Sequence, residues 1–347
     1  MGAVLGSALR SAGHPVVAVS AISRESRDRA EAMLPGVPVL DVPEVVRRAE
    51  LVLLAVPDDV LGGLVQGLAD VGAWQGGQIV VHTSGRYGVD VLAPARAAGV
   101  IPLALHPAMT FTGTSLDLSR LEGCSFAVTG PAPVLPIGQA LVVEVGGEPV
   151  VVDEEARGLY HAALAHGANH LVVLVAQAAQ ALAAAGVVDP GRMLAPLLEA
   201  ALDGALRAEQ PSSPDASEQT DRGAGAIGAL TGPVRRGDSG TVREHLEALT
   251  AFAGASGAAD VVEGYRALAR SAAGRALAAG LVSSAAATGV LDALAPGTAP
   301  GTGAAGHDGP GREGPGTDDA AGRLHQKEEQ RDDADAPYDP DGQEDDA

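Results

Sequence analysis

Residues 1–20, MGAVLGSALRSAGHPVVAVS, decide the fold. They predict a short helix, a turn at Gly13 and a strand over Val16–Ser20. Gly2 and Gly6 stand four residues apart on that helix, where small residues let a helix lie close to a sheet. This is the end of the G-x-G-x-x-G pattern of dinucleotide-binding folds, whose last glycine opens the helix. Neither the strand nor the two glycines that open the pattern precede it, so we expect Gly2 to be what remains of a cofactor site.

Composition and charge narrow the class of protein. A chain of 347 residues, 46% hydrophobic, suggests two domains with additional segments. The single Cys124 excludes an internal disulfide and a cysteine-based zinc site. No signal peptide and no confident membrane span are predicted, so a cytoplasmic location is expected. The net charge of −21 argues against nucleic acid or an anionic membrane as partner, and the only lysine, Lys327, lies in the acidic tail.

An α/β domain is predicted over residues 1–152. Short apolar runs separated by helices indicate a doubly wound sheet of parallel strands. The predicted strands are Val16–Ser20, Val37–Leu40, Leu51–Val56, Gln78–Thr83, Ile101–His106, Ser125–Thr129 and Pro149–Val152. In strand order 3-2-1-4-5-6 the missing strand is the central one, and its neighbours would each lose partners at about 1–3 kcal/mol per unpaired group. We therefore expect the natural start to lie roughly 10–20 residues upstream of Met1.

A helical domain is predicted over residues 153–295. Its first helix, Glu155–Ala185, is apolar on all sides, which predicts a buried helix around which the domain packs. Further helices are predicted at Asp189–Glu209, Thr241–Ala253, Ala258–Ala279 and Leu281–Leu294. The polar segment 210–225 predicts a disordered loop, and the Gly-, Pro- and Asp-rich tail 296–347 predicts disorder.

The loop after the strand Val16–Ser20 is the expected place of the adenosine ribose. Ser23, Arg24, Ser26 and Arg27 offer hydroxyl and guanidinium groups there that can hold a 2′-phosphate, which favours NADP over NAD. The alternative is that Ser23 caps the next helix and the arginines are solvated.

Two further strand ends face the same cofactor region. Val56, Pro57 and Asp58 end one strand, and Asp58 is expected to cap the following helix while the backbone contacts the cofactor. Thr83 and Ser84, followed by Gly85, end the next, where the backbone can approach a ligand. An ordinary turn explains this second segment equally well.

Histidines supply the candidate catalytic groups. His106 ends a strand and can orient a carboxylate or relay a proton, unless it is a structural histidine bonded to a loop carbonyl. His161, His166 and Asn169, joined by His170, lie in the long helix, and burying them is costly unless they are paired. Satisfied polar groups of a core remain the alternative. No acidic third ligand lies nearby, so no metal is expected.

A loop near the end of the helical domain carries the candidate substrate anchors. Thr231 precedes Gly232 and Pro233, which predicts a turn or a helix start. Arg236 can hold a carboxylate through two parallel hydrogen bonds. A loop ending in an Asp238 cap is the alternative.

Together these motifs resemble a known bacterial family. They are Val-Pro-Asp at 56–58, His-Thr-Ser-Gly at 82–85, Leu-His-Pro-Ala-Met-Thr-Phe at 105–111, Tyr-His-Ala-Ala at 160–163 with Asn169, and Leu-Thr-Gly-Pro with Arg-Gly-Asp at 230–238. The stretch from Gly2 to about Leu281 resembles the "Rossmann-like and domain of unknown function 2520" proteins. The resemblance implies an NADP-binding domain and a helical domain like that of 6-phosphogluconate dehydrogenase. The catalytic lysine of ketopantoate reductases and β-hydroxyacid dehydrogenases, which are similar in layout, is missing here.

Two functions follow as expectations. The first is an NADP-dependent reductase of a small carbonyl or imine acid. In it His161, or else His166, supplies a proton, Asn169 polarises the oxygen, and Thr231 or Arg236 positions a carboxylate beside His106. The second is a non-catalytic dinucleotide-binding sensor or scaffold. By analogy with the same fold, a homodimer through the helical domain is also expected.

Overall fold

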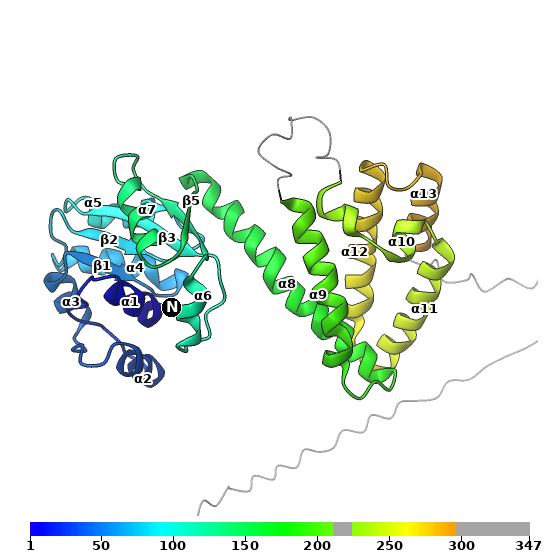
Figure 1. Ribbon diagram of the computed structural model, residues 1–347, viewed down its shortest axis with the longest axis horizontal. Helices are drawn as coiled ribbons and strands as arrows, with labels where there is room; N and C mark the ends of the chain where they lie inside the picture. Colours follow the sequence, from blue (N-terminus) through cyan, green and yellow to red (C-terminus); the bar gives the residue numbers. More distant parts are fainter. Residues whose placement is uncertain (211–223, 296–347) are drawn as a thin grey trace, which may run out of the picture. The chain divides into compact units, whose positions relative to one another are not determined.

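The computed structural model describes residues 1–210 and 224–295. Residues 211–223, most of the loop predicted over 210–225, and the predicted tail 296–347 lie outside the described part. The first part of the chain begins with three helices and then alternates strands and helices (Figure 1). Its strands are β1 (Leu51–Leu54), β2 (Ile79–His82), β3 (Ile101–Pro107), β4 (Ser125–Thr129) and β5 (Glu148–Val151). Its helices are α1 (Gly2–Ser11), α2 (Arg24–Met33), α3 (Val42–Arg48), α4 (Asp58–Asp70), η1 (Val89–Leu92, a 3₁₀ turn), α5 (Ala93–Arg96), α6 (Leu116–Leu121) and α7 (Leu135–Glu144).

The five strands form one sheet in the order β1-β2-β3-β4-β5. β1, β2 and β3 are parallel, as the sequence predicts, and β4 is parallel to β5. The prediction of an all-parallel sheet is wrong at one step, because β4 runs antiparallel to β3, with Pro107 opposite Phe126. The segment between β3 and β4 carries only the short helix α6. The chain therefore turns back at the end of β3 and does not return to the opposite end of the sheet, as a parallel connection would require.

The predicted strand over Val16–Ser20 is not part of the sheet. Val19 makes a single parallel bridge to Val39, in the second predicted strand segment, and within the described residues β1 is the edge strand of the sheet. An extended segment becomes a strand only when neighbours pair with its backbone groups. With one short partner, both segments remain isolated extended stretches.

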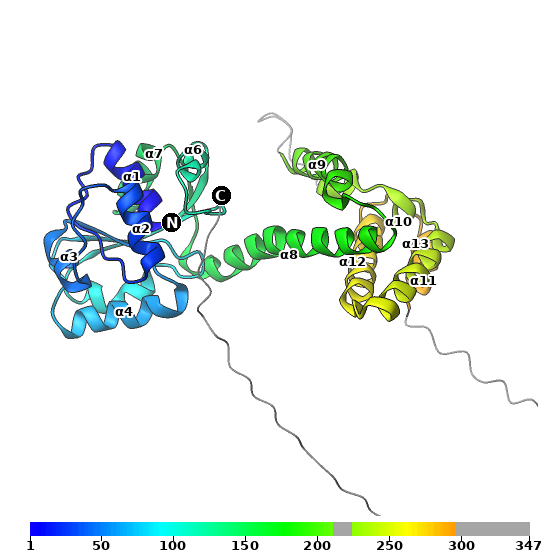
Figure 2. The same cartoon turned by 90° about the horizontal axis from the view of Figure 1, so that it is seen from below.

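Helices cover both faces of the sheet (Figures 1 and 2). On one face α1, α6 and α7 pack on β2, β3 and β4 around Phe126, Leu103 and Leu141. On the other, α3, α4 and α5 pack on β1 and β2 around Leu61 and Trp74. The two faces bury separate apolar clusters, as expected of strands that read as continuous apolar runs.

The second part is helical. It consists of η2 (Glu154–Ala156), α8 (Arg157–Ala184), α9 (Pro190–Glu209), η3 (Gly225–Ala229), α10 (Gly232–Arg236), α11 (Ser239–Ser256), α12 (Ala259–Ala278) and α13 (Ser284–Ala293). Its buried core lies between α11, α12 and α13, around Leu246, Ala273 and Val290. Asp238 caps α11 by accepting from the Thr241 backbone N–H at 3.0 Å, as its sequence position indicated.

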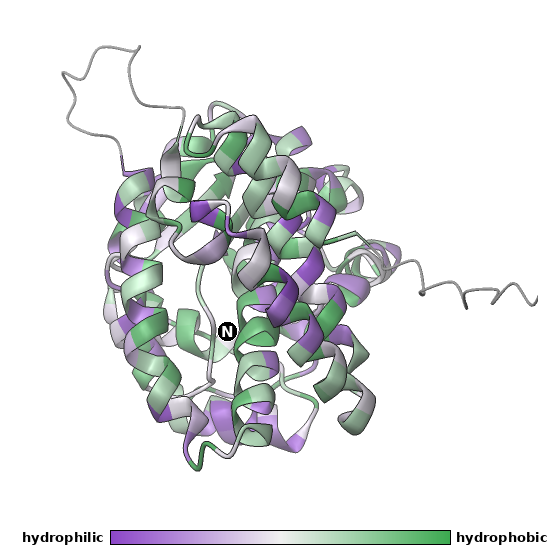
Figure 3. Cartoon of the chain, turned by 90° about the vertical axis from the view of Figure 1, so that its right-hand side faces the viewer, coloured by the Kyte–Doolittle hydropathy of each residue, from purple (hydrophilic) through white to green (hydrophobic). Residues whose placement is uncertain are grey.

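The long helix α8 is not the buried centre of this part, so that prediction is wrong. Arg157 is its only buried residue, whereas the side chains of Leu171 to Leu174 are 38–68% exposed. Hydrophobic and hydrophilic residues are interspersed over the surfaces of the helices (Figure 3). Composition predicted burial, but the neighbours of α8 within the described residues, chiefly α9, cover only part of a helix that is apolar all round. By length and composition alone, the segment Glu154–Ala184 could also cross a membrane.

Candidate functional site

Three parallel strands end at one edge of the sheet, and the candidate site is built there. In register, Leu54 of β1 lies beside His82 of β2, and His82 lies beside Ala104 of β3. The residues that follow these three positions therefore meet at the carboxyl edge, where doubly wound sheets bind their ligands.

The end of β1 leads directly into α4. Pro57 is the N-cap residue of α4 and Asp58 is its first residue. Asp58 makes no capping hydrogen bond, so the predicted cap is wrong; because Pro57 already holds the N-cap position, Asp58 lies one residue too far along to accept from the first free N–H groups. Val56 packs against the apolar cluster under α4.

His82, at the end of β2, is a buried neutral imidazole. Its Nε2 lies 2.8 Å from the carbonyl oxygen of Gly88, and its Nδ1 accepts from the Ser84 backbone N–H at 3.2 Å. This pattern places the proton on Nε2. The pKa of His82 is lowered from 6.5 to about 4, chiefly by burial; the hydrogen bond to the Gly88 carbonyl acts against this shift, and the nearby Arg157 charge contributes to it.

Thr83 and Ser84 continue from His82 and are both buried. Ser84 Oγ accepts from the backbone N–H groups of Arg86 and Tyr87, at 3.2 and 3.1 Å. These bonds describe the ordinary turn that the sequence left as an alternative. Cofactor contact by this segment stays a prediction.

His106, at the end of β3, meets the first turns of α8. Its Nδ1 lies 2.8 Å from the hydroxyl oxygen of Tyr160, and its ring is edge-on to that of His161 with centroids 6.3 Å apart. Burial lowers the pKa of His106 to about 4, with a further contribution from the charges of Arg157 and His161. Burial also raises the pKa of Tyr160. Both groups are therefore neutral near pH 7, and each can be donor or acceptor in this hydrogen bond.

Gly85 lies directly beneath the two imidazoles. A methyl group at this position would lie 2.8 Å from His106 Nε2 and 2.8 Å from His161 Cδ2, closer than carbon atoms approach. The glycine predicted to let the backbone approach a ligand instead lets it approach these rings. We call His106, Tyr160, His161 and Gly85 the strand-end cluster.

The other polar residues of α8 lie farther along the helix. His166 and His170 are exposed and their Nδ1 atoms lie 2.8 Å apart, one turn from each other. Asn169 is exposed as well. These side chains are exposed, so the expected cost of burying them does not arise. Their predicted catalytic roles are not tested by these contacts.

Thr231 and Arg236 lie at the two ends of α10. Thr231 is its N-cap residue, without a side-chain capping bond, and Arg236 is its last residue; both are exposed. Within residues 1–210 and 224–295, neither side chain hydrogen-bonds to the strand-end cluster. Their role as substrate anchors stays a prediction.

On the predicted cofactor side, Gly2 packs against the end of β1. A methyl group at Gly2 would lie 3.1 Å from the Ala55 side chain, which accounts for a small residue there. Ser23 caps α2 by accepting from the Ser26 N–H at 3.1 Å, as the alternative interpretation had it. Arg27 Nε donates to the Ala21 carbonyl at 3.1 Å, while Arg24 is exposed and lies 3.9 Å from Asp28. Arg24 and Arg27 thus lie in the first turn of α2, directly after the loop expected to meet the ribose.

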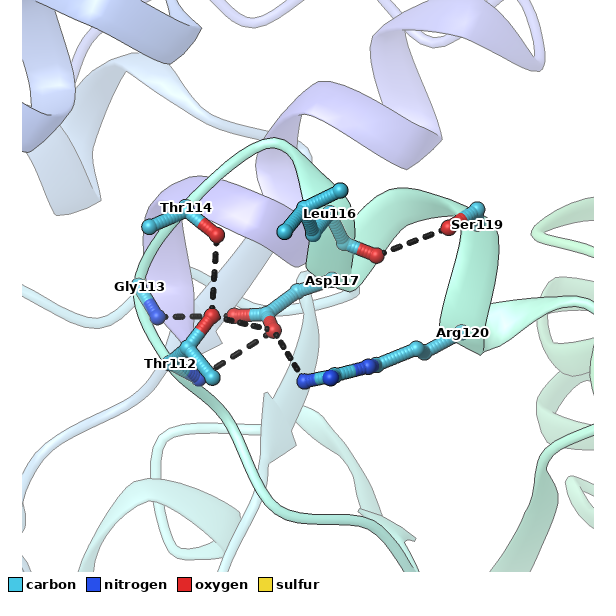
Figure 4. Close-up of polar contacts among 7 residues, drawn as sticks. All are labelled: Thr112, Gly113, Thr114, Leu116, Asp117, Ser119 and Arg120. Atoms are coloured by element: carbon cyan, nitrogen blue, oxygen red, sulfur yellow. Dashed lines mark hydrogen bonds and ion pairs between the residues drawn. The ribbon is translucent and has the colours of Figure 1, made fainter.

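The loop after β3 is shaped by one buried carboxylate (Figure 4). Asp117, at the start of α6, accepts from the backbone N–H and the hydroxyl of Thr112 and from the Gly113 N–H, at 2.7–3.1 Å. Burial alone would raise the pKa of Asp117, but these hydrogen bonds outweigh it and lower the pKa. The carboxylate stays charged and fixes the loop that follows His106.

Sequence reasoning gave no role to three residues of this region. Tyr160 was visible only as the neighbour of His161, and His82 as part of a strand-end motif. Arg157 is the only charged residue of α8, and that isolation was the one signal available. Which side chains converge depends on how α8 meets the sheet, and no local pattern encodes this.

The fold and this edge define a protein of the Rossmann-like class with a helical second part. The Rossmann-like domain model matches residues 1–107, and the domain of unknown function 2520 matches residues 124–272. The chain belongs to the family that combines these two domains. No curated protein matches it.

Solved structures share the fold at low identity. A provisionally assigned NADP oxidoreductase of Bacteroides fragilis is 19% identical, with a TM-score of 0.59, over 78% of this chain and 93% of that one. An imine reductase from Pseudomonas sp. is 18% identical, with a TM-score of 0.54, over 85% and 96%. An imine reductase from Myxococcus stipitatus in complex with NADP+ is 17% identical, with a TM-score of 0.53, over 84% and 96%. At these identities the likeness concerns the fold.

Proposed function

We propose that this chain is an NADP-dependent oxidoreductase that reduces a small carbonyl or imine acid. The observation that carries the proposal is the neutral His106–Tyr160 pair beside His161 at the carboxyl edge of the sheet. The oxidoreductases and imine reductases that share the fold support the same class of reaction. The substrate class rests on the layout of the fold and on the basic anchor Arg236.

The residues present fit the adenosine end of NADP. Arg24 and Arg27 lie in the first turn of α2, with Glu25 between them, and residues 20–23 before them carry no acidic side chain that would repel a 2′-phosphate. Gly2 leaves room at the start of α1, next to Ala55. When bound, NADPH supplies hydride. Backbone contacts from the segments 56–58 and 83–84 are part of the proposal.

The strand-end cluster supplies the proton. His161 stands beside the ring of His106, and Tyr160 connects to the other side of that ring through Nδ1. His161 gives its proton to the substrate and regains one from solvent, while the Tyr160–His106 hydrogen bond holds the neighbouring ring in place. Asn169, His166, Thr231 and Arg236 are proposed to orient the substrate oxygen and carboxylate.

The test is a screen of NADPH oxidation over 2-oxo acids and cyclic imines with the full chain. On a substrate so found, Tyr160→Phe should lower kcat roughly 100-fold or more, because His106 loses the hydrogen bond that orients its ring beside the proton donor His161. Tyr265→Phe is the matched control, since Tyr265 makes a similar hydrogen bond to His245, at 3.0 Å, in the helical part. Equal loss in both variants, or none in either, contradicts the proton role.

A non-catalytic dinucleotide sensor is the second candidate. It is favoured by the absence of lysine from the described residues and by the hydrogen bonds that already join His82 Nε2 to Gly88, Ser84 Oγ to Tyr87 and His106 Nδ1 to Tyr160. NADPH binding by calorimetry, with no turnover of any compound in the screen, would favour the sensor over the enzyme.

A second copy of this chain is the partner that we propose for α8. The four consecutive residues Leu171–Leu174 are exposed, and at 100° per residue they point to all sides of the helix, so a flat surface cannot cover them. Residues 158–184 carry no charged side chain, so two such helices do not repel each other. We also propose that the protein is located in the cytoplasm.

A further inference from the structure

Arg157 is an unusual buried charge. It is the first residue of α8, its side chain is fully buried, and none of the ion pairs among the described residues includes it. Taking a guanidinium out of water costs several kcal/mol unless its N–H groups are bonded. A buried cation without a carboxylate partner therefore needs a reason in the structure.

Its N–H groups are bonded to neutral oxygen atoms of three neighbouring strand segments. Nε donates to Thr129 Oγ1 of β4 at 2.8 Å, and one terminal nitrogen donates to the Ser84 carbonyl, just beyond β2, at 3.2 Å. The other terminal nitrogen donates to the carbonyl oxygens of Ala104 in β3 and Ala127 in β4, each at 3.0 Å. One rigid planar group thus joins α8 to three strands at once.

This attachment lies one turn before the strand-end cluster. Tyr160 and His161 follow Arg157 by three and four residues, which places them about 5–6 Å further along the helix. The Arg157 guanidinium carbon lies 5.8 Å from the centre of the Tyr160 ring. A second contact secures the same segment, because the Glu154 carboxylate accepts from the Val89 N–H at 2.6 Å. The start of α8 therefore has little freedom to turn.

We propose that Arg157 is the positioning residue of the strand-end cluster: it fixes the first turns of α8 on the sheet, so that the Tyr160 hydroxyl donates to His106 Nδ1 and the His106 proton stays on Nε2. A cation beside the phenol ring favours the phenol as donor, since donation moves negative charge toward the ring. The inference rests on the proposed function only in taking this cluster as the reacting site.

The charge of Arg157 contributes as well as its hydrogen bonds. The groups that face His106 are Arg157, Tyr160 and His161 of α8, together with His82 of β2 and Asp58 at the start of α4. After burial, the charge of Arg157 is the next largest influence that lowers the pKa of His106 to about 4, whereas Asp58 raises it. Arg157 therefore keeps His106 in the neutral form that can accept from Tyr160.

The test follows His106 by 15N spectroscopy of the full chain with labelled histidine, from pH 3.5 to 8. The His106 signals are assigned by their loss in His106→Gln. The wild-type ring should titrate near pH 4 with the proton on Nε2. Arg157→Met should raise the midpoint by at least about one pH unit, because the positive charge is lost. Arg157→Lys should keep the low midpoint but give a mixture of the two tautomers, because an ammonium cannot reproduce the planar fork.

Two further variants keep the proposal testable if Arg157→Met does not fold. Thr129→Val removes the acceptor of Nε and should also mix the tautomers. Arg270→Met, which removes an arginine bonded to the Leu294 carbonyl at 2.7 Å in the helical part, should leave His106 unchanged. Wild-type tautomer and midpoint in both Arg157→Lys and Thr129→Val, with loss of thermal stability only, would overturn the positioning role. The readout needs no turnover, so a failed NADPH screen would remove the proposed function and leave this inference standing.

Discussion

Acidification should destabilise this protein through His82 in a way that can be isolated. His82 is buried, with Nε2 against the Gly88 carbonyl and Nδ1 accepting from the Ser84 N–H. Protonation would place a second N–H at Nδ1, pointing at an N–H that cannot accept it. The folded state therefore resists the proton that the unfolded chain takes up readily.

The size of the effect follows from the two pKa values. The pKa is 6.5 for an exposed histidine and about 4 for His82 in the fold. Above pH 6.5 neither state binds the proton and stability is unaffected. Between pH 6.5 and 4 only the unfolded state binds it, so the free energy of unfolding falls as pH falls. One pKa unit corresponds to about 1.4 kcal/mol, so the full loss through His82 is about 3 kcal/mol.

Urea unfolding of wild type and His82→Gln at intervals from pH 4.5 to 7.5 measures the contribution of His82 to the free energy of unfolding. The glutamine amide can still donate to Gly88 and accept from Ser84, and it does not titrate. At pH 7.5 the variant should be less stable by about 1 kcal/mol. By pH 4.5 it should be the more stable protein. His245→Gln, at an exposed position, is the control. A wild-type-minus-variant difference that stays constant with pH would refute the reasoning.

Three further predictions concern packing, cofactor and assembly. Gly85→Ala should lower the melting temperature and displace the two imidazoles above it. Gly63→Ala is the control: it lies in an exposed turn of α4 with open space around it and should raise the free energy of unfolding by up to about 1 kcal/mol. Equal shifts of the melting temperature in the two variants would contradict the packing argument. Changing Arg24 and Arg27 together to Gln should weaken NADPH binding about 10-fold or more and NADH binding little, measured by fluorescence titration; a parallel loss for both cofactors would remove the 2′-phosphate role. Sedimentation should show a dimer of the full chain that Val172→Glu converts to monomer, and a monomeric wild type at tens of micromolar would remove the proposed second copy.

Much of the fold could be predicted from sequence pattern. Five of the seven predicted strands form within two residues of their expected ends, and the long helices follow their apolar stretches. The antiparallel pairing of β3 with β4 was not predicted, because the direction of β4 depends on the path of the connecting segment in space. The segment Val16–Ser20 has the composition of a strand, but pairing requires a neighbour that local sequence cannot supply.

The candidate site could also be predicted only in part from the sequence. Sequence pointed to His106 and His161 as residues of interest, because polar groups at strand ends and in apolar helices stand out. It did not show that the partner of His106 is Tyr160 or that His166 pairs with His170. Those contacts depend on the rotation of α8 about its axis where it leaves the sheet.

By itself the sequence determined the class of fold, because strand and helix periodicities and the small residues Gly2 and Gly6 are local properties of the chain. Tertiary structure alone decided that Arg157 is buried with no ion-pair partner in the described part of the chain, that Gly85 lies under two imidazoles, and that α8 is exposed. The physical reason is that burial and pairing belong to the space between elements. A residue's desolvation, and with it the pKa of His82 and of His106, is set by neighbours that come from distant parts of the chain.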